Sequence, residues 1–201
     1  MTDEEFAEIL ARGHEATGVE FKGPGPLSNR QLVAQVVRAV LGMANKRDGG
    51  RVIIGVEDIG GVLNPVGLND QDLATWRYDN VADRLAVYAD PSVSFELEVK
   101  EYNGNRYVIL HVAEFADIPV LCKRDYQGVL RNGACYIRTR RKPETTEIPR
   151  QADMRDLLDL ATEKRLQEYL ALLQRVGLII LPSMVPPSTE RFEQQRSDLN
   201  E

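Results

Sequence analysis

The sequence predicts an α/β protein of the mixed α+β kind, in which a central mixed β-sheet with a β-hairpin is flanked by helices. Three segments favour this class: a helix-period segment within residues 29–47, a short apolar run at 51–58 and an alternating segment at 94–114. Because helix and strand patterns alternate along the chain, helices packed on a sheet are favoured over a helical bundle.

The N-terminal segment is predicted to form a short helix, a turn and a short strand. Thr2 and Glu5 have the spacing of a capping box, and Gly13 ends the helix. The strand is "VEFK" at residues 19–22. In a strand, residues two apart share a face, so Glu20 and Lys22 lie together, with Phe21 on the other side.

A longer helix follows the "GPGP" break and begins at Ser28 or Asn29. Glycines after it end the helix, and "RVIIGVED" at 51–58 is almost wholly apolar, which is typical of a strand covered on both faces. The apolar side of the helix comprises Leu32, Val33, Val36, Val37, Val40, Leu41 and Ala44.

The remaining elements are a helix, a hairpin, a strand and a last helix. One helix runs from Asp70 to about Tyr88, and a hairpin turns at Asn103-Gly104. The segment 133–142 is a strand with Tyr136, Arg138 and Arg140 on one face. An amphipathic helix, with a candidate break near Thr162, spans 153–176 and stops at Gly177.

These elements divide the chain into three parts. Residues 1–150 are expected to form the main domain, residues 151–180 a C-terminal amphipathic helix with a short extension that is a candidate dimer element, and residues 181–201 a polar tail.

The composition is typical of a soluble globular protein, with 43% hydrophobic and 28% charged residues in 201. No apolar run has membrane-spanning length and the N-terminus is acidic, so we expect no membrane partner and a cytoplasmic location. Cys122 and Cys135 lack the spacing of a zinc site and are expected to be small core residues.

Positive charge is concentrated in one segment of an otherwise acidic chain. The net charge is −6, yet residues 120–142 hold seven basic residues and one acid. A polarised molecule of this kind binds a polyanion on one side. The candidate nucleic-acid-binding residues are Lys123, Arg124, Arg131, Tyr136, Arg138, Arg140, Arg141 and Lys142. The alternative is that the arginines pair with the acids of this chain.

Carboxylates supply the candidate chemistry. A turn at Thr17-Gly18 would return Glu15 towards Glu20, and if "VEFK" and "RVIIGVED" are sheet neighbours, Asp58 converges on them with Lys22. Such oxygen ligands suit Mg²⁺ or Mn²⁺, which can ionise water beside a phosphodiester. The alternatives are a surface ion pair between Glu20 and Lys22 and solvated acids at element ends.

Nucleotide binding and histidine catalysis are disfavoured. The chain has no Gly-x-x-x-x-Gly-Lys-Ser/Thr motif, and its glycines are explained as turn residues, so no ATP is expected. The two histidines, His14 and His111, are not accompanied by a Gly-x-Ser-x-Gly elbow. We expect His111 to be a satisfied, partly buried residue.

Four motifs occur in an order that resembles the AlbA-like domain of the Schlafen family. They are "GHEATGVEFKG", "ANKRDGG", "IIGVED" and "CYIRTRR", and the similarity spans about residues 12–150. The resemblance implies an α/β nucleic-acid-binding fold. For the nucleases of the Schlafen family, the resemblance implies a metal-dependent endoribonuclease that acts on tRNA-like or other structured RNA. Such an enzyme would take part in phage defence or in a stress response.

By the resemblance, the metal-binding carboxylates fall on Glu15, Glu20 and Asp58, and the accompanying lysine on Lys22. The Schlafen nuclease core has two similar lobes, whereas this chain has one, so a homodimer is expected to rebuild the cleft. The segment "TRRKPETTEI" departs from the Ser and Gly that many relatives have after "YIR".

Two function classes therefore stay open. The first is a metal-dependent endoribonuclease. The second is a non-catalytic module that binds RNA or DNA, because many relatives with this opening are described as DNA-binding or transcriptional regulators. Acids that face phosphate favour the first class, since they are useful there only with a cation between them.

Overall fold

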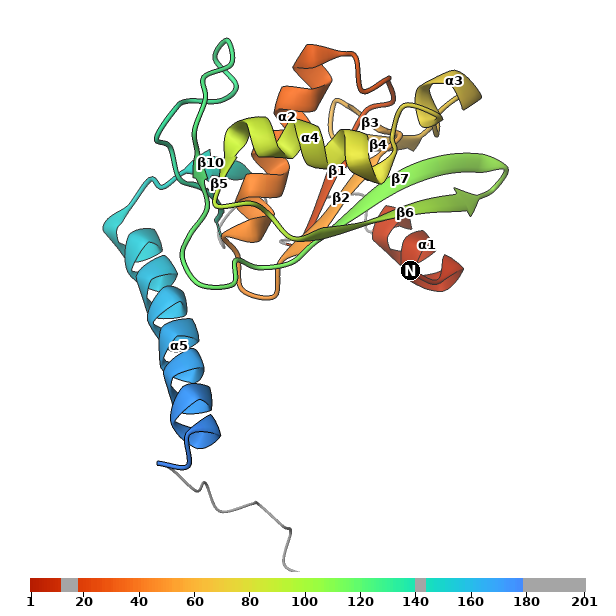
Figure 1. Cartoon of the computed structure of the whole chain (residues 1–201). Coiled ribbons are helices and arrows are strands. Elements are labelled where there is room, and N and C mark those ends of the chain that lie inside the picture. Colours follow the sequence, from red (N-terminus) through yellow and green to blue (C-terminus); the bar gives the residue numbers. More distant parts are fainter. Residues whose placement is uncertain (12–17, 140–143, 179–201) are drawn as a thin grey trace, which may run out of the picture. The chain divides into compact units, whose positions relative to one another are not determined.

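A four-stranded mixed sheet forms the centre of the computed structural model, which describes residues 1–11, 18–139 and 144–178 (Figure 1). The strand order is β1-β2-β7-β6, where β1 pairs parallel with β2 and the other pairs are antiparallel. The predicted central mixed sheet is confirmed. Its strands are β1 (Val19–Lys22), β2 (Gly50–Ile54), β6 (Phe95–Tyr102) and β7 (Asn105–Val112).

Shorter strand pairs and the helices surround this sheet. The pairs are β3 (Val56–Ile59) with β4 (Val62–Pro65), β5 (Ala89–Asp90) with β8 (Leu121–Cys122), and β9 (Tyr136–Arg138) with β10 (Thr145–Glu147). The helices are α1 (Asp3–Ala11), α2 (Arg30–Ala44), α3 (Asp70–Leu73), α4 (Tyr78–Tyr88) and α5 (Gln151–Arg175).

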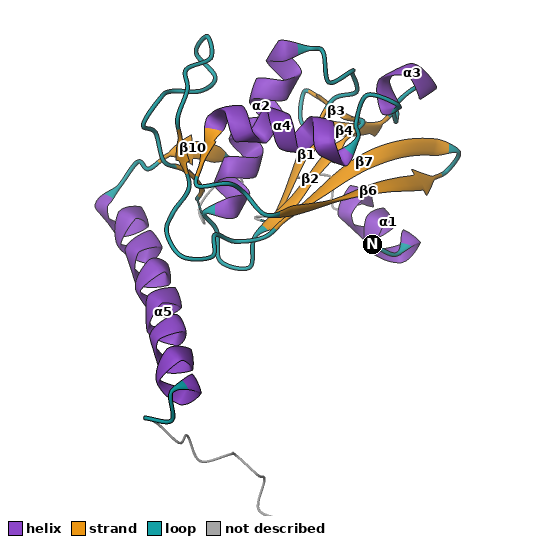
Figure 2. Ribbon diagram, in the orientation of Figure 1, coloured by secondary structure: helices purple, strands orange, loops and turns teal. Residues whose placement is uncertain are grey.

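The two faces of the sheet pack against different helices. Figure 2 shows α2 and α4 on one face and α1 on the other. The alternation of β2 explains this arrangement, because Val52 and Ile54 join the cluster around α2, while Ile53 joins the cluster around Phe6 of α1. In chain order α2 lies between β1 and the parallel strand β2, so this helix makes the crossover between them.

Several predicted local features are confirmed. Thr2 and Glu5 form the capping box, with hydrogen bonds of 3.1 Å in both directions. Asn29 caps α2. The β6–β7 hairpin turns at Asn103 and Gly104, whose φ angles of 50° and 76° match the turn that a two-residue hairpin loop prefers.

The predicted single strand at 51–58 is wrong, because the chain leaves the sheet at Gly55. This residue has a φ of +111°, and a Cβ there would lie 3.0 Å from side-chain atoms of Leu68 and Tyr107. Beyond it, β3 pairs only with β4. Asp58 therefore lies in an exposed hairpin and not at the end of a buried strand.

The predicted helix from Asp70 to Tyr88 is divided into α3 and α4. Trp76 lies between them, is buried, and donates its indole N–H to the carbonyl oxygen of Gly25 at 2.9 Å. This contact holds Trp76 in the core at the point where the helical path is interrupted. The cap is Asn69, whose side chain accepts from the backbone N–H of Asp72.

The chain divides into two units, Met1–Lys164 and Arg165–Glu201. The helix α5 runs unbroken through Thr162, and its first half contributes Leu157 and Leu160 to the core of the first unit. Within the described ranges, no helix combines the length and apolar character that crossing a membrane requires.

Candidate functional site

Glu20 and Lys22 lie on the same face of the edge strand β1, as predicted. Val19 and Phe21 pack into the apolar cluster beneath α1, so the two charged residues of the strand face the opposite side. The Lys22 ammonium donates to Oε1 of Glu20. Glu20 is nevertheless buried, so the contact is not the exposed surface ion pair that one alternative proposed.

The second carboxylate oxygen of Glu20 contacts the β9–β10 hairpin. The Arg138 guanidinium donates to Oε2 of Glu20, and the Thr145 hydroxyl donates to the same oxygen at 2.9 Å. Arg138 also donates to the carbonyl oxygen of Val19 at 2.8 Å. The Arg138 side chain is 0% exposed and that of Glu20 is 10% exposed, so this ion pair lies in the protein interior.

The absence of a side chain at Gly42 brings the hairpin close to α2. A Cβ at this position would lie 2.6 Å from Cγ2 and 2.9 Å from the hydroxyl oxygen of Thr145. Nearby, Arg38 donates to the carbonyl oxygen of Thr145 at 2.9 Å. Close packing of α2 on β10 therefore positions the hydroxyl that reaches Glu20.

Asn45 holds the other strand of the hairpin and was missed in the sequence. Its buried side-chain amide donates to the carbonyl oxygens of Val120 and Tyr136 at 2.7 and 2.9 Å, and its oxygen accepts from the Val120 N–H at 2.7 Å. The available signal was a polar residue directly after the apolar helix segment, in "ANKRDGG".

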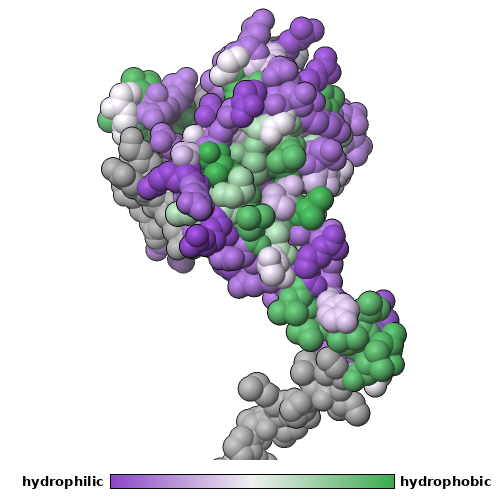
Figure 3. Space-filling model, turned by 90° about the vertical axis from the view of Figure 1, so that its left-hand side faces the viewer, coloured by the Kyte–Doolittle hydropathy of each residue, from purple (hydrophilic) through white to green (hydrophobic). Residues whose placement is uncertain are grey.

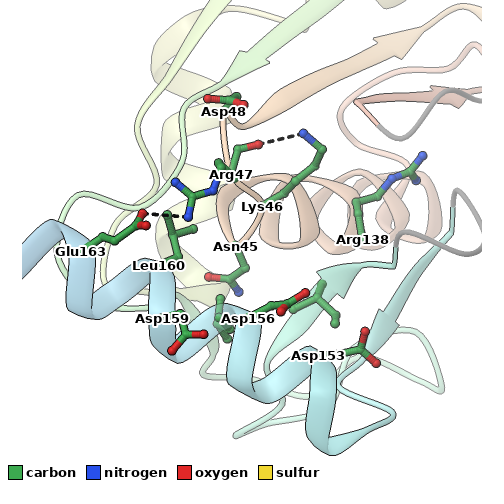
Figure 4. Close-up of a pocket in the computed structure, with 12 residues that line it drawn as sticks. Asn45, Lys46, Arg47, Asp48, Arg138, Asp153, Asp156, Asp159, Leu160 and Glu163 are labelled. Carbon is green, nitrogen blue, oxygen red and sulfur yellow. Dashed lines mark hydrogen bonds and ion pairs between the residues drawn. The ribbon is translucent and has the colours of Figure 1, made fainter.

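A pocket of about 470 Å³ lies among the end of α2, β9 and the first half of α5 (Figure 4). Its charged groups are largely paired, since Arg47 contacts Glu163 at 2.7 Å and Lys46 donates to the carbonyl oxygens of Arg47 and Gly49. In Figure 4 the Arg138 side chain extends away from α5. The lining residues are Asn45, Lys46, Arg47, Asp48, Ile137, Arg138, Asp153, Asp156, Leu157, Asp159, Leu160 and Glu163.

The described part of the expected metal site does not fit a divalent cation. Both oxygens of Glu20 already accept from Lys22, Arg138 and Thr145. Oδ1 of Asp58 accepts a hydrogen bond of 2.7 Å from the backbone N–H of Gly61, in an exposed turn. Across residues 1–11, 18–139 and 144–178, no three His, Cys, Asp or Glu side chains are grouped for a metal. Glu15 lies outside the described residues.

Only part of the predicted basic surface is exposed. Lys123, Arg124 and Arg131 are exposed on the segment before β9, whereas Tyr136 and Arg138 are buried. The predicted exposed face for Tyr136 and Arg138 is wrong, because all three residues of β9 are covered. Arg140, Arg141 and Lys142 lie outside the described residues.

Tyr136 is a packing residue of the hairpin. Its hydroxyl accepts from the backbone N–H of Arg131 at 2.8 Å, and the Arg38 guanidinium lies 5.4 Å from its ring centroid. Burial raises the pKa of the Tyr136 phenol above its usual value. The ring is therefore occupied by the protein's own side chains.

Arg131 pairs with Glu147 of β10 in an exposed contact. Nε of Arg131 lies 3.0 Å from each oxygen of the Glu147 carboxylate. The hydrogen bonds from Arg131 lower the pKa of Glu147. The side chains are 63% and 40% exposed, so solvent screens this pair.

His111 and the two cysteines are packed within the protein or paired with another side chain. His111 contacts the Glu98 carboxylate at 2.7 Å, which confirms the expected satisfied partner. Cys122 is buried and Cys135 is half-buried, and neither forms a disulfide. Burial raises the pKa of the Cys135 thiol to about 11, so at neutral pH it is not a reactive thiolate.

A family model described as "Schlafen, AlbA_2" matches residues 15–147. One similar solved structure is the DIP2311 protein from Corynebacterium diphtheriae, with a TM-score of 0.50 and 20% identity, which covers 72% of this chain and 26% of that one. This chain thus spans about a quarter of that protein's length, and the similarity shows the fold alone.

Another similar solved structure is the N-terminal domain of a RecG-related protein from Nitrosomonas europaea. Its TM-score is 0.46 and its identity is 24%, and the match covers 65% of this chain and 86% of that one. No curated protein matches this chain.

Proposed function

Because the chain belongs to the Schlafen AlbA_2 family, we propose that it binds nucleic acid, with RNA as the ligand. The observation that supports this most is the exposed group Lys123, Arg124 and Arg131, which lies on one segment of a protein whose net charge is −6. Local positive charge on an acidic protein restricts a polyanion to one side and contributes affinity by releasing counterions.

The experiment measures RNA affinity against salt for Lys123→Ala/Arg124→Ala. If each lysine or arginine contacts one phosphate of a single strand, the double variant loses affinity and its log–log salt slope becomes shallower by about 1.4. The matched control, Arg77→Ala/Arg84→Ala, removes two other exposed basic side chains and should leave the slope unchanged. Equal losses in both variants would show that binding follows net charge and not this surface.

The choice of RNA over DNA rests on the resemblance to Schlafen nucleases. It is tested with single strands of the same sequence in both chemistries, and with a tRNA pool. Tighter binding of DNA than of RNA would contradict it and favour the regulator class.

Metal-dependent RNA cleavage is the second candidate function, with the defence or stress role that the resemblance implies. The resemblance to Schlafen nucleases supports it, whereas the contacts of Glu20 with Lys22, Arg138 and Thr145 count against this carboxylate as a metal ligand. A tRNA pool incubated with Mn²⁺, Mg²⁺ or chelator tests it. Cleavage that needs metal and survives in Glu20→Gln would remove Glu20 from the chemistry.

We propose that the active form is a homodimer. Apolar side chains gather on the part of α5 that leads to the grey tail (Figure 3). An apolar stripe on a helix needs cover, and a second copy of the chain would supply it. The exposed apolar residues there are Leu166, Tyr169 and Leu172, and Val176 follows directly after the helix.

Light scattering at micromolar concentration tests the dimer. We expect a dimer mass for the wild type and a monomer mass for Leu166→Glu/Tyr169→Glu, in which like charges enter the interface. The control Gln167→Glu/Gln174→Glu adds the same charge to other faces of the helix. A monomeric wild type with full RNA affinity would exclude the dimer from the mechanism.

A further inference from the structure

Three of the protein's own side chains donate hydrogen bonds to the Glu20 carboxylate. Lys22 donates to one oxygen, and Arg138 and Thr145 donate to the other. We infer that Lys22 and Arg138 are the resident counter-ions of Glu20, and that this carboxylate anchors the β9–β10 hairpin to the edge strand β1 instead of ligating a divalent cation. This inference concerns a site separate from the exposed basic surface and does not depend on nucleic-acid binding.

The coordination chemistry supports this assignment. Mg²⁺ requires near-octahedral oxygen ligands and keeps several bound waters. Glu20 is only 8% exposed, and the donors around it are an ammonium, a guanidinium and a hydroxyl. A hydrated cation would therefore have to displace two positive charges from the carboxylate.

The burial of Arg138 makes that displacement unfavourable. Its side chain is 0% exposed, and an arginine in a protein does not lose its proton. If a metal took the Glu20 carboxylate, the buried guanidinium would lose a charged partner and face the cation itself. Loss of one member of a buried ion pair is strongly destabilising.

The Glu20–Arg138 pair lies at the edge of the sheet, and this position explains its structural role. The edge strand β1 has a single neighbour in the sheet, β2, and its outer side is free of strand pairing in the described structure. Arg138 bridges this edge, because it contacts both the Glu20 side chain and the carbonyl oxygen of Val19. The pair therefore fastens β1 to a hairpin that is 118 residues away in sequence.

The same contacts give Glu20 an indirect connection to the basic surface. The hairpin carries Glu147, which contacts Arg131, and Tyr136, whose hydroxyl accepts from the Arg131 N–H. A variant that loosens the hairpin will therefore disturb the basic segment too. Reduced RNA binding or cleavage in a Glu20 variant would not by itself identify a metal ligand, and the test must avoid nucleic acid.

The test combines thermal melts and Mn²⁺ titration of the full chain. Wild type, Glu20→Gln, Arg138→Met and the exposed control Glu147→Gln are melted in chelator and in millimolar Mn²⁺. We expect the wild-type melting temperature to be the same in both buffers. In chelator, Glu20→Gln and Arg138→Met should each melt well below wild type, whereas Glu147→Gln should melt close to it.

Titration of the folded wild type covers the case in which a variant does not fold. Mn²⁺ bound to wild type and to Asp58→Asn is measured by electron paramagnetic resonance, with Asp58→Asn removing an exposed carboxylate. We expect no tightly bound Mn²⁺ in either protein, and tight binding that remains in Asp58→Asn would count against the inference. The inference would be overturned by a wild-type melting temperature that rises with Mn²⁺ and does so less in Glu20→Gln. It would also fail if Glu20→Gln melted like the wild type in chelator.

Discussion

The β9–β10 hairpin carries two acid–arginine pairs that differ in their surroundings. Arg138 and Glu20 are 0% and 10% exposed, whereas Arg131 and Glu147 are 63% and 40% exposed. Both pairs are close contacts between the same types of group. The interior pair cannot exchange its partners for water, while the surface pair can, so the two pairs should differ greatly in their effect on stability.

The comparison also separates two kinds of role for basic residues in this segment. Both arginines come from the basic stretch 120–142, which the sequence treats as one nucleic-acid surface. Burial assigns Arg138 to the fold and leaves Arg131 on the surface, where it pairs with Glu147. A count of basic residues therefore overestimates the surface that can meet phosphate.

The largest expected effect comes from Arg138→Met. Removal of one partner leaves the buried carboxylate of Glu20 without its arginine, and we expect a loss of about 3–5 kcal/mol in the free energy of unfolding. Urea denaturation at pH 7 measures it, with Arg131→Met as the matched control. A loss no larger than that of the control would remove the distinction between the two pairs.

A double replacement sharpens the result. In Glu20→Leu/Arg138→Met no buried charge is left unpaired within the pair, so its destabilisation should be smaller than the sum of the single variants, by a coupling of about 0.5–3 kcal/mol. Lys22 and Thr145 still lose their acceptor, which limits the recovery. Strict additivity in the four denaturation curves would mean that the two side chains do not interact in solution.

Gly42→Ala tests whether close packing supports the interior pair. Alanine gains helix propensity of about 1 kcal/mol, but the new Cβ must displace Thr145 at a cost of about 1–3 kcal/mol, so we expect a net loss of about 1 kcal/mol. The difference between Gln35→Ala and Gln35→Gly on the exposed face of α2 gives the propensity alone. A stabilised Gly42→Ala protein would show that the hairpin shifts freely.

The smallest effect is expected at the exposed pair. Arg131→Met should reduce the free energy of unfolding by about 0.2–1 kcal/mol, and this loss should shrink at high salt. A salt-independent loss of several kcal/mol would show that the pair is less screened than its exposure indicates.

The exposed pair also has a defined pH dependence. The pKa of Glu147 is lowered in the folded protein by hydrogen bonds from Arg131, so its contribution is present above the unfolded pKa and is lost as pH falls through the folded value. The stability difference between wild type and Glu147→Gln should therefore decrease on acidification from pH 6 to pH 3. Denaturation curves across that range check the sign, and a difference that grows towards acid pH would contradict it.

Local sequence patterns were enough to predict the contact between Glu20 and Lys22, but not the contact between Glu20 and Arg138. The two-residue spacing of Glu20 and Lys22 fixes a shared strand face, and the structure places them in contact. Their partner was not predictable in this way. Arg138 was assigned to an exposed face because alternation within β9 says which residues share a face but not which face is covered.

The predicted placement of Asp58 at the end of a buried strand failed for a related reason. The apolar run 51–58 has the composition of one buried strand, yet Gly55 adopts a φ of +111° and the chain leaves the sheet there. What requires glycine is the approach of Leu68 and Tyr107, which come from later parts of the chain. The sequence shows a glycine within the apolar run but not the later residues that pack against it.

The sequence by itself determined the family, the mixed sheet, the β-hairpin and the shared face of Glu20 and Lys22. These depend on motif order and on periodicities of two or 3.6 residues, which are properties of short segments. Only the tertiary structure decided that Glu20 faces Arg138, that Asp58 lies in an exposed hairpin and that Arg131 stays exposed. Burial is set by segments more than 100 residues apart in the chain, and burial decides whether a charge is a structural partner or an accessible one.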